Sequence, residues 1–463
     1  MSHAGKDIKF SLKVMVNKKK GKVLFAEVDS SFADVLLSFL TLPLGTIVRI
    51  LKKHYGDDAP AFGSLSTLYN GLANLDSDHF WTEGAKSILL HPRSSSDAEC
   101  KKLGLDISDS PPFEYFVCSK ECYKLRLRSI SMFYDITGKC NSCKGNLIKE
   151  VVDNNDAQIV ACEDGVFTKT TVSFLITDDL HIMPNAGLSQ IVSVLGITDM
   201  DEAETILITF GFPNVMDLLK ASLTSPTPLS DLIFKKTTKM SSTKRIYEDG
   251  TSSISNSKTM NLKLMVQKST NKLLYAEAEE DFVEFLFSFL IIPLGGVVSL
   301  LSRNSNLKPI DSLYKSAADL IHDKYFKNPD AKNRLIKPSI PHGYLSENHI
   351  LPLTKECLLL APYNIFSCGW RSSTRFPNGQ GSYLKGPRTY KIADDLTVTP
   401  FCIISILSGL KDQKIPVSDV KEVMLQIGLK EALSILKASL TSTTALSDAL
   451  LSQVVKEPSK REV

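Results

Sequence analysis

The sequence predicts an α+β protein made by tandem duplication, in which each copy opens with a β-hairpin and a helix and closes with helices. Three observations predict this. Residues 12–45 and 262–295 align without a gap at a constant offset of 250. Each of these stretches passes from a period of two to the helical period. The closing stretches 219–225 and 436–442 both read LKASLTS.

The hairpin and the first helix follow from local patterns. Apolar and polar residues alternate from Leu12 to Val16, and 23–28 form the returning strand after a polar turn. Apolar residues then recur at helical spacing on one face, at Phe32, Val35, Leu36, Phe39 and Leu40, until Pro-Leu-Gly ends the helix.

A capping box is predicted at the start of this helix in both copies. Ser31 and Asp34 have its spacing, and Asp281 and Glu284 stand at the matching positions. In such a box the acid reaches back to the first free amides of the helix. We therefore expect Asp34 and Glu284 to lie at helix N-termini.

Length and composition predict two domains joined by a linker. A chain of 463 residues is too long for one core, and 43% hydrophobic with 23% charged residues is typical of globular proteins. We predict a first repeat at 8–234, a flexible basic Ser/Thr-rich linker at 235–259, and a second repeat at 260–455. The linker's net charge of +4 exceeds the chain's +3, so the two repeats lack the positive field of a dedicated nucleic-acid binder.

Compartment and membrane topology are inferred from cysteines and hydropathy. The chain has nine cysteines and opens without a signal-peptide pattern, which favours the cytoplasm, with the nucleus as the alternative. Phe282–Leu301 is apolar over about the ~20 residues of a membrane span. Glu284 and Pro293 interrupt it, so we predict a buried helix and a turn, and no membrane partner.

Four cysteines form the main candidate site. Cys118 and Cys122 make one short-spaced pair, and Cys140 and Cys143 make a second pair after seventeen intervening residues. This spacing fits a four-thiolate zinc site, in which each pair supplies two ligands from one tight turn. Strands predicted at 113–117, 123–128 and 146–152 give a β-rich, zinc-ribbon-like middle. A closed four-thiolate sphere indicates one structural zinc ion rather than a catalytic one.

The second copy lacks most of these ligands. Leu353 stands in place of Cys118, Cys357 matches Cys122, and residues 376–379 replace the second pair. We therefore expect zinc in the first copy alone. The remaining cysteines have no partner at a suitable spacing and are expected to be ordinary buried residues: Cys100, Cys162, Cys368 and Cys402.

A search for an active site finds no phosphate loop, HExxH or GxSxG motif. The repeated acids Asp178, Asp179, Asp394 and Asp395 are interpreted as turn or capping carboxylates. His79 and His91 are interpreted as structural, and the lysines of the first hairpin tip as a solvated turn. No catalytic residue is predicted, and we expect the protein not to be an enzyme.

Several of these segments together resemble a known family. They are FSLKVMVNKKKGKVLFAE, SFADVLLSFLTLPLGTI, GSLSTLYNGLANLDSDHFW, FLITDDLHIMPN and the paired cysteines. They are similar to the plant family called "domain of unknown function 674", over nearly the whole chain. The resemblance implies a plant protein with tandem units and supports Cys118, Cys122, Cys140 and Cys143 as the family's paired cysteines. It implies no activity.

Three functions are compatible with these patterns. The first is an intracellular scaffold or interaction module with an unidentified protein partner and one structural zinc. The second is a nucleic-acid-associated zinc ribbon, because basic and aromatic residues surround the cysteines. These are Lys120, Tyr123, Lys124, Arg126, Arg128, Phe133, Tyr134, Lys139 and Lys144. The third is an enzyme of a class without a motif in this sequence.

Overall fold

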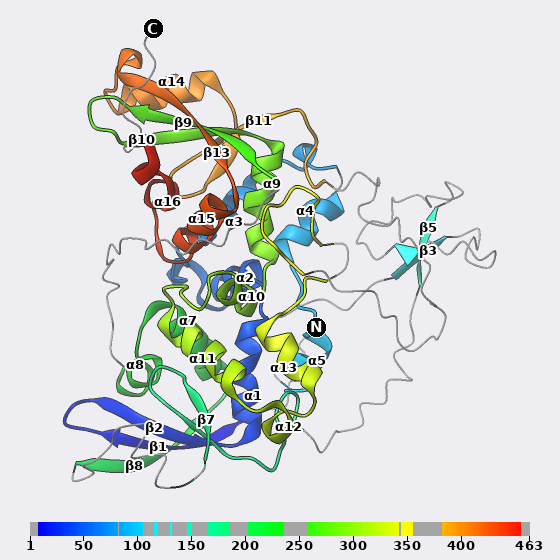
Figure 1. Cartoon of the computed structure of the whole chain (residues 1–463), viewed down its shortest axis with the longest axis vertical. Coiled ribbons are helices and arrows are strands. Elements are labelled where there is room, and N and C mark those ends of the chain that lie inside the picture. Colours follow the sequence, from blue (N-terminus) through cyan, green and yellow to red (C-terminus); the bar gives the residue numbers. More distant parts are fainter. Residues whose placement is uncertain are drawn as a thin grey trace.

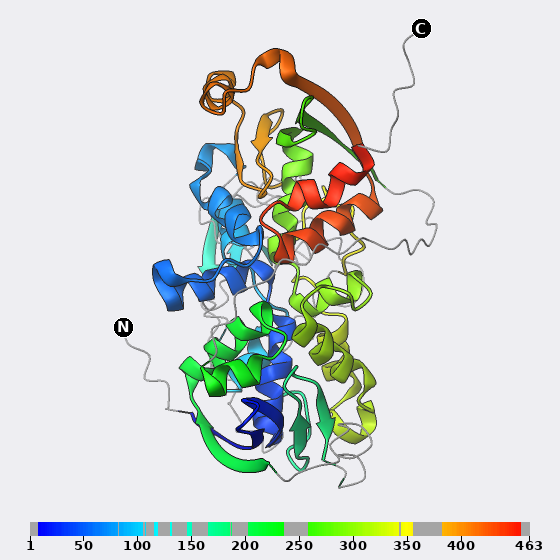
Figure 2. The ribbon, with the colours of Figure 1, turned by 90° about the vertical axis from the view of Figure 1, so that its left-hand side faces the viewer.

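The computed structural model is an elongated α+β molecule with a β-sheet at each end of its long axis and helices between them (Figures 1 and 2). The structure describes residues 8–81, 83–104, 107, 115–118, 130–131, 146–150, 165–185, 187, 202–235, 258–341, 344–354 and 382–454. We call residues 8–235 the N-terminal half and residues 258–454 the C-terminal half.

The sheet of the N-terminal half has five antiparallel strands in the order β7-β6-β2-β1-β8. Alternation of buried and exposed side chains along β1 directs one face to the core, as the period of two predicts. The predicted hairpin is confirmed, and a bulge lies at Met15/Val16. The strands are β1 (Phe10–Asn17), β2 (Lys22–Val28), β6 (Phe174–Ile176), β7 (Ile182–Pro184) and β8 (Ala203–Phe210).

The sheet of the C-terminal half repeats this arrangement in the order β12-β11-β10-β9-β13. Its first two strands are again a hairpin with a register shift, at Leu273/Tyr275. The strands are β9 (Met260–Gln267), β10 (Leu273–Glu279), β11 (Thr389–Ile392), β12 (Val398–Pro400) and β13 (Val420–Ile427).

Most helices lie between the two sheets, and one, residues 403–412, packs on the outer face of the C-terminal sheet (Figure 1). The N-terminal half contains α1 (Ser30–Ser38), α2 (Leu44–Tyr55), α3 (Leu65–Asn74), α4 (Glu83–Leu90), α5 (Asp97–Lys101), α7 (Phe212–Thr224) and α8 (Pro228–Phe234). The C-terminal half contains α9 (Glu280–Ser288), α10 (Leu294–Leu300), α11 (Lys308–Asp319), α12 (His322–Tyr325), α13 (Pro329–Ile336), α14 (Ile403–Asp412), α15 (Leu429–Thr441) and α16 (Ala445–Val454). Short 3₁₀ turns are η1 (Phe39–Thr41), η2 (Gly56–Asp58), η3 (Ser77–His79), η6 (Phe289–Ile291) and η7 (Val417–Asp419).

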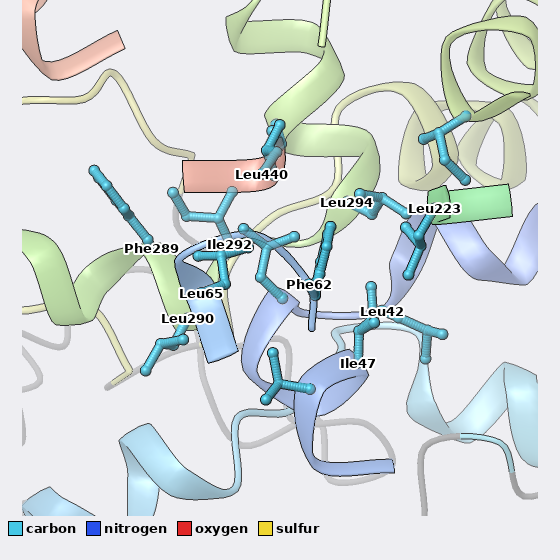
Figure 3. Close-up of a cluster of buried hydrophobic side chains, with 14 of the residues drawn as sticks. Leu42, Ile47, Phe62, Leu65, Leu223, Phe289, Leu290, Ile292, Leu294 and Leu440 are labelled. Atoms are coloured by element: carbon cyan, nitrogen blue, oxygen red, sulfur yellow. The ribbon is translucent and has the colours of Figure 1, made fainter. Parts of the chain in front are cut away.

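The two halves meet through equivalent residues at their Pro-Leu-Gly turns. Leu44 N donates to Ile292 O at 3.0 Å, and Leu294 N donates to Leu42 O at 2.9 Å. These pairs exchange under the offset of 250, so the contact is of the two-fold, isologous kind. A Cβ on Gly45 would lie 3.0 Å from Leu290 O, which explains the glycine at this close approach. Apolar side chains from both halves surround the contact (Figure 3).

In each half, one helix also packs against the sheet of the opposite half. Ser316 on α11 accepts a hydrogen bond at 2.8 Å from the backbone N of Ile182 on β7. In return, Thr67 on α3 donates to the backbone O of Asp395, beside β12. One apolar core therefore runs through both halves.

Two predictions about the first helix of each half have different outcomes. Phe282–Leu301 is a buried helix, a 3₁₀ turn and a second helix, as expected. Within the described ranges, no helix has the length and apolar character of a transmembrane segment. The capping-box prediction is wrong. Asp29 caps α1 by accepting from Phe32 N at 2.9 Å, while Asp34 and Glu284 face the interior and are fully buried.

A small third sheet is formed by residues from the middle of the N-terminal half's sequence, with the strand order β4-β3-β5. It consists of β3 (Tyr115–Cys118), β4 (Ile130–Ser131) and β5 (Leu147–Glu150), all antiparallel. Strands were predicted at 113–117 and 146–152. β3 overlaps the first span and ends one residue beyond it, and β5 lies inside the second span. The strand predicted at 123–128 lies outside the described residues.

Candidate functional site

One of the four candidate zinc ligands, Cys118, lies at one end of this small sheet. Cys118 is the last residue of β3, and its backbone pairs with Leu147, the first residue of β5. Cys122, Cys140 and Cys143 lie outside the described residues. Because β3 and β5 are antiparallel, the chain leaves β3 and enters β5 at the same end of the ladder.

Chain length limits how far the other ligands can lie from Cys118. Cys122 follows Cys118 by four residues, and Cys143 precedes Leu147 by four residues. Four residues span at most about 14 Å when fully extended. Since Cys118 and Leu147 are direct partners, chain length alone limits Cys122 and Cys143 to about 14 Å from this end of the ladder. The described strands are therefore compatible with the four-cysteine spacing, and four thiolates are a ligand set that zinc prefers.

Two of the remaining cysteines can be compared with expectation. Cys100 is partly buried, its sulfur lies 3.6 Å from Thr41 Oγ1, and burial raises the pKa of its thiol to about 12. This pKa keeps Cys100 neutral and unreactive. The prediction for Cys402 is wrong, because this residue is exposed at the start of α14. Cys162 and Cys368 lie outside the described residues.

Asp34 is a fully buried acid of the N-terminal half. Its two oxygens accept hydrogen bonds from three successive backbone amides, at 2.6 Å (Val166), 3.0 Å (Phe167) and 2.9 Å (Thr168). The hydroxyl of Thr168 adds a fourth bond at 2.8 Å. Burial raises the pKa of Asp34 to about 6, although these donors act to lower it. The carboxyl therefore fastens residues 166–168 to α1.

Glu284 occupies the matching position of the C-terminal half with different partners. It accepts from the backbone N of Leu384 at 2.6 Å. Side-chain donors supply its other bonds: Ser346 at 2.6 Å, Asn348 at 2.9 Å and Ser382. Burial raises the pKa of Glu284 as well. Both acids therefore hold the segment that leads into the sheet of their own half.

These fastened segments in turn meet the opposite half. Thr168 forms an isolated antiparallel bridge with Phe326, and Leu384 forms one with Phe80. Both bridges join one half to the other, and each pairs a segment fastened by a buried acid with a phenylalanine of the opposite half. The buried acids thus stabilise the junction between the halves.

Asp178 and Asp394 act as capping carboxylates, as interpreted from the sequence. Asp178 accepts from Ser230 N at 2.8 Å and from Ser230 Oγ at 2.6 Å, in the first turn of α8. Asp394 accepts from Ser447 N and Oγ at the same two distances, in α16. Burial raises the pKa of both carboxyls.

Asp179 joins the two halves instead. It accepts from Thr177 at 2.6 Å and from Ser312 of α11 at 3.2 Å, and lies 3.6 Å from the ammonium of Lys308. Burial acts to raise the pKa of Asp179, but these neighbours hold it below its ordinary value. Asp178 and Asp179 serve different helices, so they do not form an acid–base pair.

His79 and the lysine-rich tip of the first hairpin also contact other described residues. His79 Nδ1 lies 3.1 Å from Tyr390 OH across the junction of the halves. Lys18 and Lys19 form ion pairs with Glu204 and Glu202, which is the solvated turn expected from the sequence. The basic and aromatic residues around the cysteines lie outside the described residues.

A cavity lies beside the exchanged helix α3. Thr67, Asn70, Gly71, Asn74 and Leu75 of the α3 segment and residues 397–400 line a space of about 170 Å³. Gly71 stands where α11 has Ser316, and a Cβ on Gly71 would lie 3.0 Å from the backbone N of Val398 on β12, so the glycine allows a close approach of helix and strand. The space suits about five water molecules and is smaller than the ~300 Å³ of ordinary cofactor sites.

Comparison with known families decides the identity. The family model described as "Protein of unknown function (DUF674)" matches residues 6–428 and 372–463. The chain belongs to this family. No curated protein and no solved structure is similar to this DUF674 member. The resemblance noted from the repeated segments and the paired cysteines is thereby confirmed at the level of the family.

Sequence reasoning missed the two buried acids as a site. Their helical spacing from Ser31 and Asp281 mimicked a capping box, and this hid a second signal. Asp34 and Glu284 lie next to apolar positions of the buried helix face, Val35 and Phe285. An acid placed within an apolar stripe at the same point of both halves indicates a buried carboxyl with built-in donors.

Proposed function

We propose that this DUF674 protein is a non-enzymatic intracellular scaffold or interaction module, stabilised by one structural zinc ion. The zinc would be held by Cys118, Cys122, Cys140 and Cys143. One observation carries the metal proposal: β3 and β5 pair so that Cys118 faces the residue four positions after Cys143. The cytoplasm is the proposed compartment, the nucleus the alternative, and a plant the proposed source.

The described acids support a structural rather than a chemical role. Asp34 and Glu284 use their oxygens to hold internal segments, and Asp178 and Asp394 hold helix termini. Their carboxyls stabilise the fold and are committed to fixed donors. A closed four-thiolate zinc site would act in the same way, because metal binding contributes directly to folding.

We further propose that the two halves arose by tandem duplication. The shared strand order and the reciprocal contacts of Leu42 and Leu294 support this origin. A single ancestral unit would have paired with a second copy through the same turns, because such a contact is self-complementary. Only one half retained, or acquired, the cysteines.

Zinc content tests the metal proposal. Purified wild-type protein should contain about one zinc per chain by elemental mass spectrometry. Cys118→Ser should lose this zinc, because three thiolates bind it less well. Cys357→Ser is the matched control, since its counterparts in the C-terminal half are missing, and it should keep full zinc. Wild-type protein without zinc, or equal loss in both variants, would contradict the proposal.

Nucleic-acid binding is the alternative, and a gel-shift titration separates it from a scaffold. A zinc-ribbon binder should shift single-stranded or duplex oligonucleotides, with an affinity that falls steeply as salt increases. We expect no salt-sensitive shift at micromolar protein. The third function, an enzyme, would be supported by a turnover that persists through purification and disappears on substitution of one pocket residue.

A further inference from the structure

The four edge strands of the two large sheets are treated differently. The edges at β7 and β12 are covered by the exchanged helices α11 and α3. The opposite edges, β8 and β13, are eight residues long, and no described residue pairs with their outer side. A row of free backbone donors and acceptors is a template for another strand.

The backbone of β13 presents alternate residues to this open side. Lys268 N donates to Asp419 O at 2.7 Å, which sets the phase of the antiparallel ladder with β9. Bonding to β9 then falls on odd-numbered residues from 419 to 427. The N–H and C=O groups of Val420, Glu422, Met424 and Gln426 therefore point away from the sheet. Figure 2 shows β13 as the orange strand along the outside of the upper sheet.

Exposed apolar side chains gather beside β13, on α14 and η7 as well as on the strand itself. Of the eight large hydrophobic side chains exposed among the described residues, five lie between 403 and 424: Ile403, Ile404, Leu407, Val417 and Met424. Met424 is 60% exposed and Ile404 77% exposed. The β8 edge has one exposed large apolar side chain of its own, Leu207 at 70%, and no helix like α14 is described beside it. Both edges carry an ion-paired acid, Glu204 on β8 and Glu422 on β13, so the apolar side chains of α14 and η7 are what distinguish the β13 edge.

We propose that β13 is a self-association edge, at which two copies of this chain pair antiparallel about Met424. The occupant is a second copy because the strand complements itself in this register. Met424 meets Met424 of the other copy, Glu422 meets Gln426, and Val423 meets Leu425, so like charges do not oppose. The five-stranded C-terminal sheets of the two copies would thereby form one ten-stranded sheet.

Helix α14 belongs to the same surface. Its buried side chains Ile406 and Leu410 pack against Met265 and Tyr275 on the outer face of the sheet. Met265 is the ladder partner of Glu422, so Met424 lies on that face too. Pairing of β13 would place both α14 helices on one side of the joined sheet. Because stable dimers bury at least ~1,200 Å² in total, one strand pair with these few side chains predicts a weak, concentration-dependent dimer.

Sedimentation of the full chain tests this proposal. Between about 1 and about 100 µM, wild-type mass should rise from 51.1 kDa towards a dimer. Met424→Lys should weaken dimerisation by about tenfold or more, since two ammonium groups would face each other across the pairing. Leu207→Lys, at the equivalent exposed position of β8, is the matched control and should dimerise as wild type does.

Met424→Pro provides a second variant if the lysine disturbs folding. Its N–H points outwards, so proline removes a donor of the intermolecular ladder and leaves the bonds with β9 in place. Unchanged circular dichroism with loss of the dimer is expected. A wild-type protein that stays at 51.1 kDa throughout, a dimer that survives both Met424 variants, or equal loss with Leu207→Lys would overturn the proposal.

Discussion

Asp34 and Glu284 occupy the same position of the two halves, yet different groups hold them. The shorter Asp34 is surrounded by three consecutive backbone amides, whose positions are set by the chain itself. The longer Glu284 reaches one backbone amide and the side chains of Ser346, Asn348 and Ser382. Both halves therefore bury an acid at this position of the fold, whereas the groups that donate to the acid depend on its side-chain length and on the nearby loops.

The largest expected effect is the loss of stability when each buried acid is replaced by alanine. Asp34→Ala should lower the free energy of unfolding by about 3 kcal/mol or more, because three fixed amides and one hydroxyl lose their acceptor. Glu284→Ala should lower it less, by about 1–2 kcal/mol, because three of its donors are side chains that can rotate to other partners. Urea denaturation of both variants measures the difference, and a larger loss for Glu284→Ala would reverse the comparison.

Protonation should reveal the cost of burying Asp34. Its pKa is about 6 in the folded protein against an ordinary 3.8. The folded carboxyl holds its proton more tightly, so this contribution is complete below pH 4 and is lost as the pH rises through 6. The change amounts to at most about 3 kcal/mol.

Asp34→Asn isolates this group, because other buried acids shift in the same direction. The unfolding free energy of wild type minus that of Asp34→Asn should fall between pH 4 and pH 7. A difference that is constant with pH, or that rises, would mean that the donors outweigh burial.

A smaller effect is expected where the helix exchanges differ. Ser316→Ala removes the acceptor of Ile182 N and should cost about 1–2 kcal/mol. Ser434→Ala is the control, because its exposed hydroxyl donates to Lys430 of its own helix, and it should cost less than about 0.5 kcal/mol. Equal thermal shifts in the two variants would show that the contact with Ile182 adds nothing.

Cutting the linker should have the smallest effect. Limited proteolysis should cleave first between Lys235 and Thr259, where the segment is basic and poor in apolar residues. The two fragments should still elute together on gel filtration, because one core runs through both halves. A denaturing gel verifies the cut. Separate elution, or first cleavage within 12–45, would contradict a shared core.

The paired strands and helices were predictable because their signals are local. Alternation at Leu12–Val16 and helical spacing from Phe32 to Leu40 depend only on which side of an element faces the core. The candidate zinc ligands were also found by spacing, although their proposed role awaits the zinc measurement. The capping prediction failed because spacing alone cannot tell an acid at a helix start from one turned inwards.

By itself, the sequence determined the repeated α+β elements, the turn at Pro43 and Pro293, and the family. Only the tertiary structure decided that α3 and α11 exchange sheets, and that Asp34 and Glu284 receive their donors from segments between 62 and 134 residues away. Periodicity records whether a side chain is buried, but not against which partner. Which segments pack together depends on contacts between residues far apart in the sequence. The exchanged arrangement of α3 and α11 is favoured because each helix supplies hydrogen-bonding groups that the open strand edge lacks.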